Sequence, residues 1–238
     1  MHYGQPAGFF ASLPPTRSAT KWLCGITLAV SALSSMAERN FSFGASQLVY
    51  RADAVVEGEF WRLFTYPFVE RSFIGLMISL LIVWLFGRIY ESRWGTRDFI
   101  KFYIAAGTGA GILAIPLAIL LNVILPFQDV AVAEGPGAII TALLITMAIT
   151  APNSNILFGF VLPMRSRTLI YVMIGMELLS GMMNGAASLS VTLGGMAMGY
   201  LLVTGWWNPK RWANAIARRK KTNRTRRGLY VVPQSDRD

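Results

Sequence analysis

The sequence predicts an all-α, polytopic membrane protein with six transmembrane helices. Composition and pattern lead to this fold class. Of the 238 residues, 54% are hydrophobic and only 14% are charged, and the mean hydropathy is +0.47. A folded domain in water is nearer a quarter charged, because its surface needs polar cover that a lipid-facing surface does not. The chain also contains six separated apolar runs, and a helix satisfies its own backbone hydrogen bonds in lipid.

The six apolar runs are expected to form the membrane helices, at 21–37, 73–90, 99–121, 137–150, 168–183 and 188–207. Most are close to the twenty or so residues that a helix needs to cross hydrocarbon. The run at 137–150 is shorter, and its boundaries are the hardest to predict. The alternatives are a start as early as Val130 or a thinner, protein-buried helix. The expected organisation is a cytosolic arm at 1–20, a membrane domain at 21–207 and a basic cytosolic tail at 208–238.

The stretch between the first two runs, 38–72, is too long for a tight connection and rich in aromatic residues. We expect a folded element that lies in the headgroup zone, where aromatic rings are favoured. A plain lumenal loop is the alternative. The aromatic residues that favour the headgroup zone are Phe60, Trp61, Phe64, Tyr66 and Phe68.

Lysine and arginine predict the orientation, because they are retained on the cytosolic side of a membrane. With both termini cytosolic, all but four of the 22 cations lie on that side, and the four exceptions belong to the first loop. The basic tail is expected to contact anionic membrane lipids rather than nucleic acid. A chain with one cysteine, Cys24, no convincing signal peptide and a basic tail fits a bacterial inner (plasma) membrane best.

Four landmarks in order along the chain resemble the rhomboid superfamily. They are the segments 59–68 in the first loop, 84–96 at the end of the second helix, 135–139 at the start of the fourth and 192–200 on the sixth. Each is weak alone, since GxxxG pairs are common in membrane helices. Their order and spacing favour a rhomboid-like six-helix bundle. Gly195 and Gly199 are expected to allow close packing against the fourth helix, where Gly137 and Ala138 also offer small surfaces. The motif residues are Trp61, Arg62, Glu91, Gly95, Gly137, Gly195 and Gly199.

The same resemblance implies that the catalytic groups of a rhomboid protease are missing. The position of the family's serine nucleophile is occupied by Pro136, and that of its histidine base by Thr192. Gly75 and Ser79 match the histidine and asparagine that bind the oxyanion. A serine protease needs an activated nucleophile and a base, so the resemblance predicts an inactive, peptidase S54-like pseudoprotease.

No other catalytic pair is evident in the sequence. The one histidine is His2, in the N-terminal arm, and no lysine lies between Lys101 and Lys210. The family's inactive members imply a different role, which is to bind or guide the transmembrane segments of client proteins. Active intramembrane proteolysis, as a family label suggests, is the first alternative.

A small transporter or channel is the second alternative, and it depends on Glu177 in the fifth run. A carboxyl group at membrane depth is costly unless it is paired, protonated or functional. Asn184 follows it by two helical turns on nearly the same face. These two residues are therefore a possible client or polar site. No cluster of histidine and cysteine and no phosphate-binding loop is present, so no metal and no cofactor is expected.

Overall fold

The computed structural model describes residues 18–40, 44–124, 132–150, 155–158, 162–165 and 185–205, with scattered positions between 168 and 179. Within these residues the chain is mostly helical, as predicted. The long helices there are α1 (Ser18–Asn40), α5 (Phe73–Trp94), α6 (Thr96–Ile124), α7 (Gly137–Thr150) and α9 (Ala186–Thr204).

Three of these helices, α5, α6 and α9, are long and apolar enough to cross a membrane, and α7 is a shorter apolar helix. Three of the predicted membrane helices are thus confirmed. The prediction of six crossings remains a prediction, because the fifth predicted run, 168–183, lies mostly outside the described residues.

Helix α1 is more polar in sequence than the other long helices, and several of its hydroxyl groups face the interior of the bundle. Four of its hydroxyl residues, Thr20, Thr27, Ser31 and Ser34, are buried. Its large exposed apolar side chains include Trp22, Ile26, Leu33 and Met36, while its exposed charged residues Lys21 and Glu38 lie toward its two ends. A helix of a water-soluble protein has the opposite pattern, with its apolar face inward.

Two short antiparallel strand pairs correct the all-α prediction. In the first, β1 (Tyr50–Arg51) pairs with β2 (Val132–Ala133), with Tyr50 opposite Ala133. The second is the hairpin of β3 (Asn155–Phe158) and β4 (Leu162–Arg165), which follows α7. Both pairs are too short to give a readable alternation of polar and apolar residues, which is why the sequence did not reveal them.

The helix boundaries differ from the apolar runs where polar groups cap the ends. Helix α1 begins at Ser18 rather than at residue 21, and α6 begins at Thr96 rather than at 99. At the other end, α9 stops at Thr204, because Gly205 adopts the left-handed conformation (φ +65°) that commonly ends a helix. Helix α7 coincides with its predicted run.

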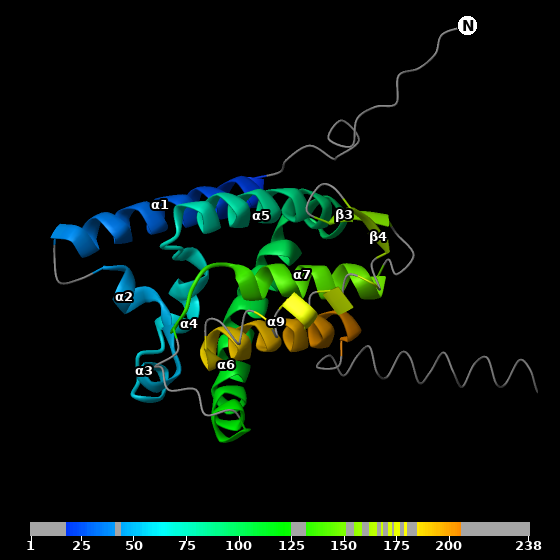
Figure 1. The fold of residues 1–238 in the computed structure, drawn as a ribbon. Coiled ribbons are helices and arrows are strands. Elements are labelled where there is room, and N and C mark those ends of the chain that lie inside the picture. The colour runs from blue at the N-terminus through cyan, green and yellow to red at the C-terminus, as the bar shows by residue number, and fades with distance from the viewer. Residues whose placement is uncertain are drawn as a thin grey trace, which may run out of the picture.

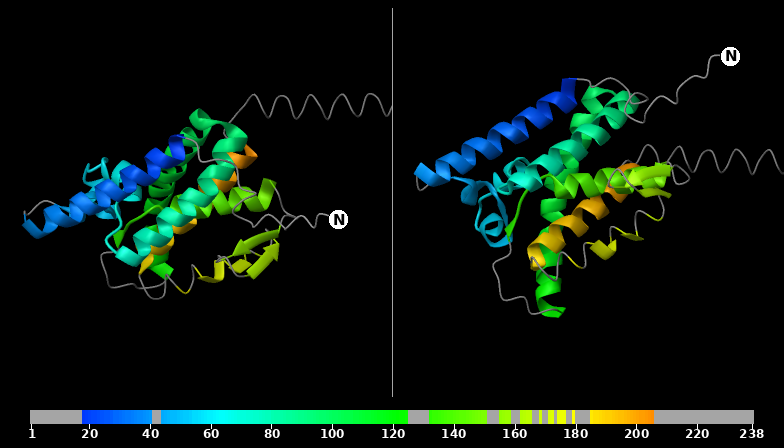
Figure 2. Two further views of the ribbon diagram at one scale, coloured as in Figure 1. Left: turned by 90° about the horizontal axis from the view of Figure 1, so that it is seen from above. Right: turned by 45° about the horizontal axis from the view of Figure 1, so that its top comes forward.

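The helices pack as two pairs joined by α6. Figures 1 and 2 show α1 alongside α5 and α7 alongside α9, with α6 crossing between the pairs. Glycines on α9 make the close approach possible. A Cβ atom on Gly199 would lie 2.7 Å from the Ala142 Cα, and one on Gly194 would lie 2.5 Å from the Ala110 carbonyl oxygen. The α9 backbone therefore contacts both α6 and α7 directly.

The pair of α7 and α9 is parallel. A Cβ atom on Gly195 would collide with the Ala138 carbonyl, and one on Gly199 would collide with Ala142. Four residues forward on one helix thus match four residues forward on the other, and Figure 1 shows the two helices running in the same direction. The predicted packing of Gly195 and Gly199 against the fourth helix is confirmed. Its partners are Ala138 and Ala142, whereas a Cβ on Gly137 would touch nothing within 4 Å.

Candidate functional site

The first loop is folded, as predicted, and covers one end of the bundle. It contains the short helices α2 (Ala45–Leu48), α3 (Ala52–Val56) and α4 (Arg62–Thr65), followed by the 3-10 turn η1 (Tyr66–Phe68). We call this end of the molecule, formed by residues 44–72 and 132–136, the loop face. The opposite end carries the tight connection between α5 and α6, and we call it the turn face.

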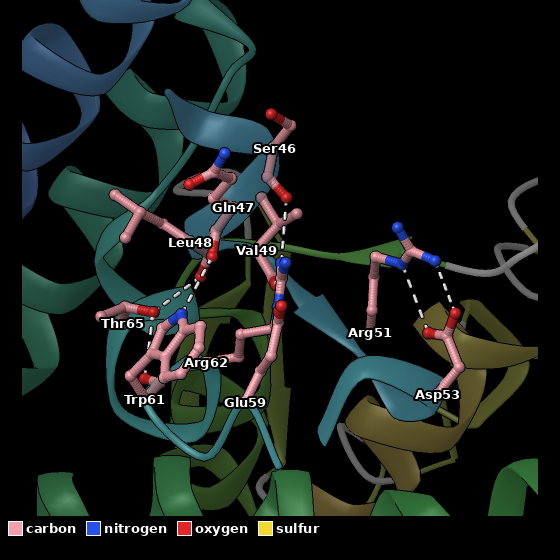
Figure 3. Close-up of polar contacts among 10 residues, drawn as sticks. All are labelled: Ser46, Gln47, Leu48, Val49, Arg51, Asp53, Glu59, Trp61, Arg62 and Thr65. Carbon is pink, nitrogen blue, oxygen red and sulfur yellow. Dashed lines mark hydrogen bonds and ion pairs between the residues drawn. The ribbon is translucent and has the colours of Figure 1, made fainter. Parts of the chain in front are cut away.

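Arg62 holds the loop together from inside. Its side chain is buried, with 5% of its surface exposed. Its Nη1 donates to the carbonyl oxygens of Ser46 and Val49, both at 2.9 Å, and its Nε donates to the Glu59 carboxylate (Figure 3). A buried guanidinium is costly unless its donors are used, and here they tie three turns of the loop together. The predicted motif residue Arg62 is therefore a structural clamp.

The neighbouring Trp61 points outward. Half of its surface is exposed, and its indole nitrogen lies 3.4 Å from the Gln47 carbonyl oxygen (Figure 3). Phe60 and Phe64 are exposed as well. Tyr66, by contrast, is fully buried. The loop aromatics predicted for the headgroup zone thus divide between an outer group and the core.

Two buried tyrosines attach the loop to α6. The Tyr50 hydroxyl donates to the Gly111 carbonyl oxygen at 2.9 Å, and the Tyr66 hydroxyl donates to that of Gly107 at 2.8 Å. Their rings meet edge to face at 5.6 Å. Burial raises the pKa of both phenols, so both remain protonated donors. The first loop is consequently a fixed part of the bundle.

The segment before α7 is attached to the same loop. Gly135, at φ +79°, donates its backbone N–H to the carbonyl oxygens of Tyr66 (3.0 Å) and Val69 (2.7 Å). The following residue is Pro136, the predicted site of the lost nucleophile. It precedes the first residue of α7 and is buried.

Pro136, Gly75, Ser79 and Thr192 are the four positions at which the family's catalytic groups are missing, and we call them the degenerate positions. Gly75 is in the first turn of α5, where its N–H donates to the capping Ser72 hydroxyl at 3.2 Å. Ser79 is one turn further along and half-buried. The Thr192 hydroxyl donates to the Ser188 carbonyl oxygen at 3.0 Å. The parallel register of α7 and α9 puts Thr192 at the same end as Pro136.

A carboxylate that the sequence analysis missed lies among these positions. Glu70 is half-buried, and a Cβ atom on Gly75 would lie 2.8 Å from its Oε1. A Cβ atom on Gly135 would lie 2.5 Å from its Oε2. Burial raises the pKa of the Glu70 carboxyl, and the Glu134 carboxylate raises it further. The Ser72 N–H and Arg71 lower this pKa, but their effects are smaller. Nothing in the local sequence marks Glu70, because one of the two glycines beside it, Gly135, comes from a distant segment of the chain.

The turn face contains a second buried charged residue, Glu91, which is fully buried near the end of α5. Its Oε1 accepts from the Ala19 N–H (3.0 Å) and the Thr96 hydroxyl (2.8 Å). Its Oε2 accepts from the Thr20 N–H (2.9 Å) and hydroxyl (2.7 Å). Glu91 thus caps the first turn of α1 from another helix, and Gly95, at φ +85°, makes the turn that brings Thr96 to it.

A family model described as "Eukaryotic integral membrane protein (DUF1751)" matches residues 21–206, most of the chain. The chain belongs to this family. No curated protein matches the sequence of this DUF1751 protein.

The family confirms an integral membrane protein and overturns the predicted host. A eukaryotic family conflicts with a bacterial inner membrane, so that prediction is wrong. It rested on a single cysteine, the lack of a convincing signal peptide and a basic tail. Membrane proteins of eukaryotic cells share all three features, and none of them distinguishes the two hosts.

The remaining predicted site of this DUF1751 protein, Glu177 and Asn184, lies outside the described residues. Among the residues that the structure describes, no three histidine, cysteine, aspartate or glutamate side chains gather closely enough to hold a metal ion. The loop face is therefore the candidate functional site. It combines the degenerate positions with a rigid loop and a half-buried carboxylate.

Proposed function

We propose that this DUF1751 protein has a rhomboid-like fold with six membrane helices, and that it binds transmembrane segments of other membrane proteins without cleaving them. In this proposal the protein is a pseudoprotease of the peptidase S54-like type. The observation that carries it is the Glu70 carboxylate between Gly75 and Gly135.

The parallel packing of α7 and α9 supports six crossings. Two parallel helices that follow each other in the described chain start at the same end of the bundle. The chain between them, 151–185, has to connect opposite ends, which fits one further crossing at the predicted fifth run. The inside-out polarity of α1 supports a crossing there too, since apolar residues face outward and hydroxyls face inward.

Chemistry at the loop face supports the absence of cleavage. Acyl transfer needs hydrogen-bond donors aimed at the developing oxyanion. The resemblance places Gly75 where the family has a histidine that binds the oxyanion. In this chain the group beside Gly75 is the Glu70 carboxylate. An anion there opposes a second negative charge. Pro136 has no hydroxyl, and Thr192 has no basic nitrogen, so the nucleophile and the base are absent as well.

An apolar face on α5 is the surface that we propose for binding. Phe73, Ile74, Met77, Ile78 and Leu81 are all exposed and follow one another at helical spacing. This face starts at the N-terminal end of α5, where Gly75 and Glu70 lie. A client helix packed there would present its backbone near the loop face.

Site-specific photocrosslinking tests the binding. A photoreactive amino acid at Ile78 is compared with one at Ile112, an equally exposed position on α6. Both variants are reconstituted in liposomes with a tagged single-span membrane protein whose transmembrane helix contains glycine or proline. We expect adducts to the tagged span from Ile78 and few from Ile112. Equal yields from both positions would contradict a binding face on α5.

A further inference from the structure

A second feature of the molecule is an apolar notch between the first loop and α6, and none of the degenerate positions lines it. Its volume is about 160 Å³. Leu63, Phe64 and Pro67 form the wall on the loop side, and Ile104 and Thr108 form the wall on α6. The lining is almost entirely hydrocarbon, and the Thr108 hydroxyl donates to the Ile104 carbonyl oxygen at 2.8 Å. The notch therefore suits an apolar occupant.

The notch opens toward lipid. Phe64 and Ile104 are exposed at its rim, at 58% and 46%. Ile104 belongs to the same exposed face of α6 as Ile112 and Ile119, within a segment long and apolar enough to span the membrane. Exposed apolar residues on such a segment contact acyl chains. With α6 spanning a bilayer, the mouth of the notch would face acyl chains.

Its walls are fixed by close packing. Gly107 forms part of the floor, and a Cβ atom there would lie 3.1 Å from the Ile139 Cδ1 and 3.2 Å from the Pro67 Cγ. The loop wall is held to α6 by the hydrogen bond from Tyr66 to the Gly107 carbonyl. Since neither wall can close on the other without breaking these contacts, the hollow persists.

We propose that this notch is a lipid-binding site that holds the upper part of one phospholipid acyl chain. An apolar cavity of about 150 Å³ stays dry and binds a molecule such as benzene, so the notch takes roughly six carbons of a chain. The exposed aromatic residues Phe60, Trp61 and Phe64 belong at headgroup depth. The carbons next to the lipid carbonyl are the ones at that level. A helix, at about 10 Å across, is too wide to enter beneath the loop.

The test uses the full chain in nanodiscs of phosphatidylcholine that carries a diazirine near the carbonyl end of one acyl chain. After illumination, mass spectrometry maps the adducts. We expect them to be severalfold more abundant at Leu63, Ile104 and Thr108 than at Ile112 and Ile119. Equal labelling along α6 would show only the ordinary lipid shell and would overturn the proposal.

A filling variant provides the second readout. Thr108→Phe places a ring in the notch from its half-exposed rim, and Ile112→Phe adds a similar ring to the open face of the same helix. We expect the first variant to lose the adducts at Leu63 and Ile104 severalfold and the second to keep them. Persistent labelling of Leu63 in Thr108→Phe would contradict a site inside the notch. The parent labelling ratio decides the question independently of either variant.

Discussion

The cap that Glu91 places on α1 leads to the sharpest prediction about stability. The change is Glu91→Gln, which preserves the size of the side chain and replaces one carboxylate oxygen by an NH₂ group. In the parent, each oxygen accepts two hydrogen bonds, from donors on α1 and on the α5–α6 turn. The amide retains one accepting oxygen. Two of the four donors then face another donor at a fully buried position.

The expected cost follows from those two donors. A buried donor left without its partner costs about 1–3 kcal/mol. The Thr20 hydroxyl can rotate and accept a bond from the new amide, which relieves part of the loss. We therefore expect Glu91→Gln to lower the free energy of unfolding by about 2–4 kcal/mol. The first turn of α1 is affected most, since its Ala19 and Thr20 N–H groups lose their acceptor.

Equilibrium unfolding of the detergent-solubilised protein measures this loss, and hydrogen exchange at residues 18–24 locates it. The matched control is Glu57→Gln, at an exposed carboxylate of the first loop, where a change within about 0.5 kcal/mol is expected. Equal stability of the two variants would refute the cap, and so would unchanged exchange in the first turn of α1.

Three further predictions concern the loop face and the helix packing. Arg62→Lys removes the forked donors to two carbonyls and should destabilise the loop by about 1–3 kcal/mol. The control, Arg51→Lys, changes a more exposed arginine and should have little effect. Limited proteolysis of the loop distinguishes the two variants. Gly199→Val should prevent α9 from packing on α7 and abolish the folded monomer on gel filtration, whereas Gly137→Ala, with open space around it, should be tolerated. Burial and Glu134 raise the pKa of Glu70 in the folded protein, so acidification from neutral pH down through that raised pKa should increase the melting temperature. Glu70→Gln should remove this increase. An equal pH dependence of the melting temperature in both proteins would count against the raised pKa.

The membrane helices could be predicted from the sequence, because lipid requires long apolar runs and such runs stand out. Helix α7 has the bounds of its apolar run, although an earlier start had been left open. The small residues on α9 also predicted close packing against the fourth helix, and Gly195 and Gly199 do meet α7. Of the two small residues expected on α7, Ala138 does meet Gly195. Gly137 looked suitable by size but faces open space, since helix rotation depends on all neighbours at once.

The polar interactions could not be predicted, because they join segments far apart in the chain. Glu91 stood out only as part of a motif, and its donors on α1 lie 71 and 72 residues away. Glu70 carried no signal at all, although it lies against Gly75 and Gly135. The strand pair of Tyr50 and Ala133 is likewise a product of the fold. Local pattern gives helices, while the loop face is created by tertiary contacts.

Cleavage of a generic rhomboid substrate in liposomes tests the central claim most directly. The parent is run beside an active rhomboid, the Pro136→Ser, Thr192→His double variant, and that variant with Glu70→Gln added. We predict no cleavage by the parent while the active control works. If the loop face has rhomboid geometry, activity should appear in the engineered variants and be higher once the Glu70 charge is removed. Cleavage by the parent that persists after contaminating proteases are excluded would contradict the account.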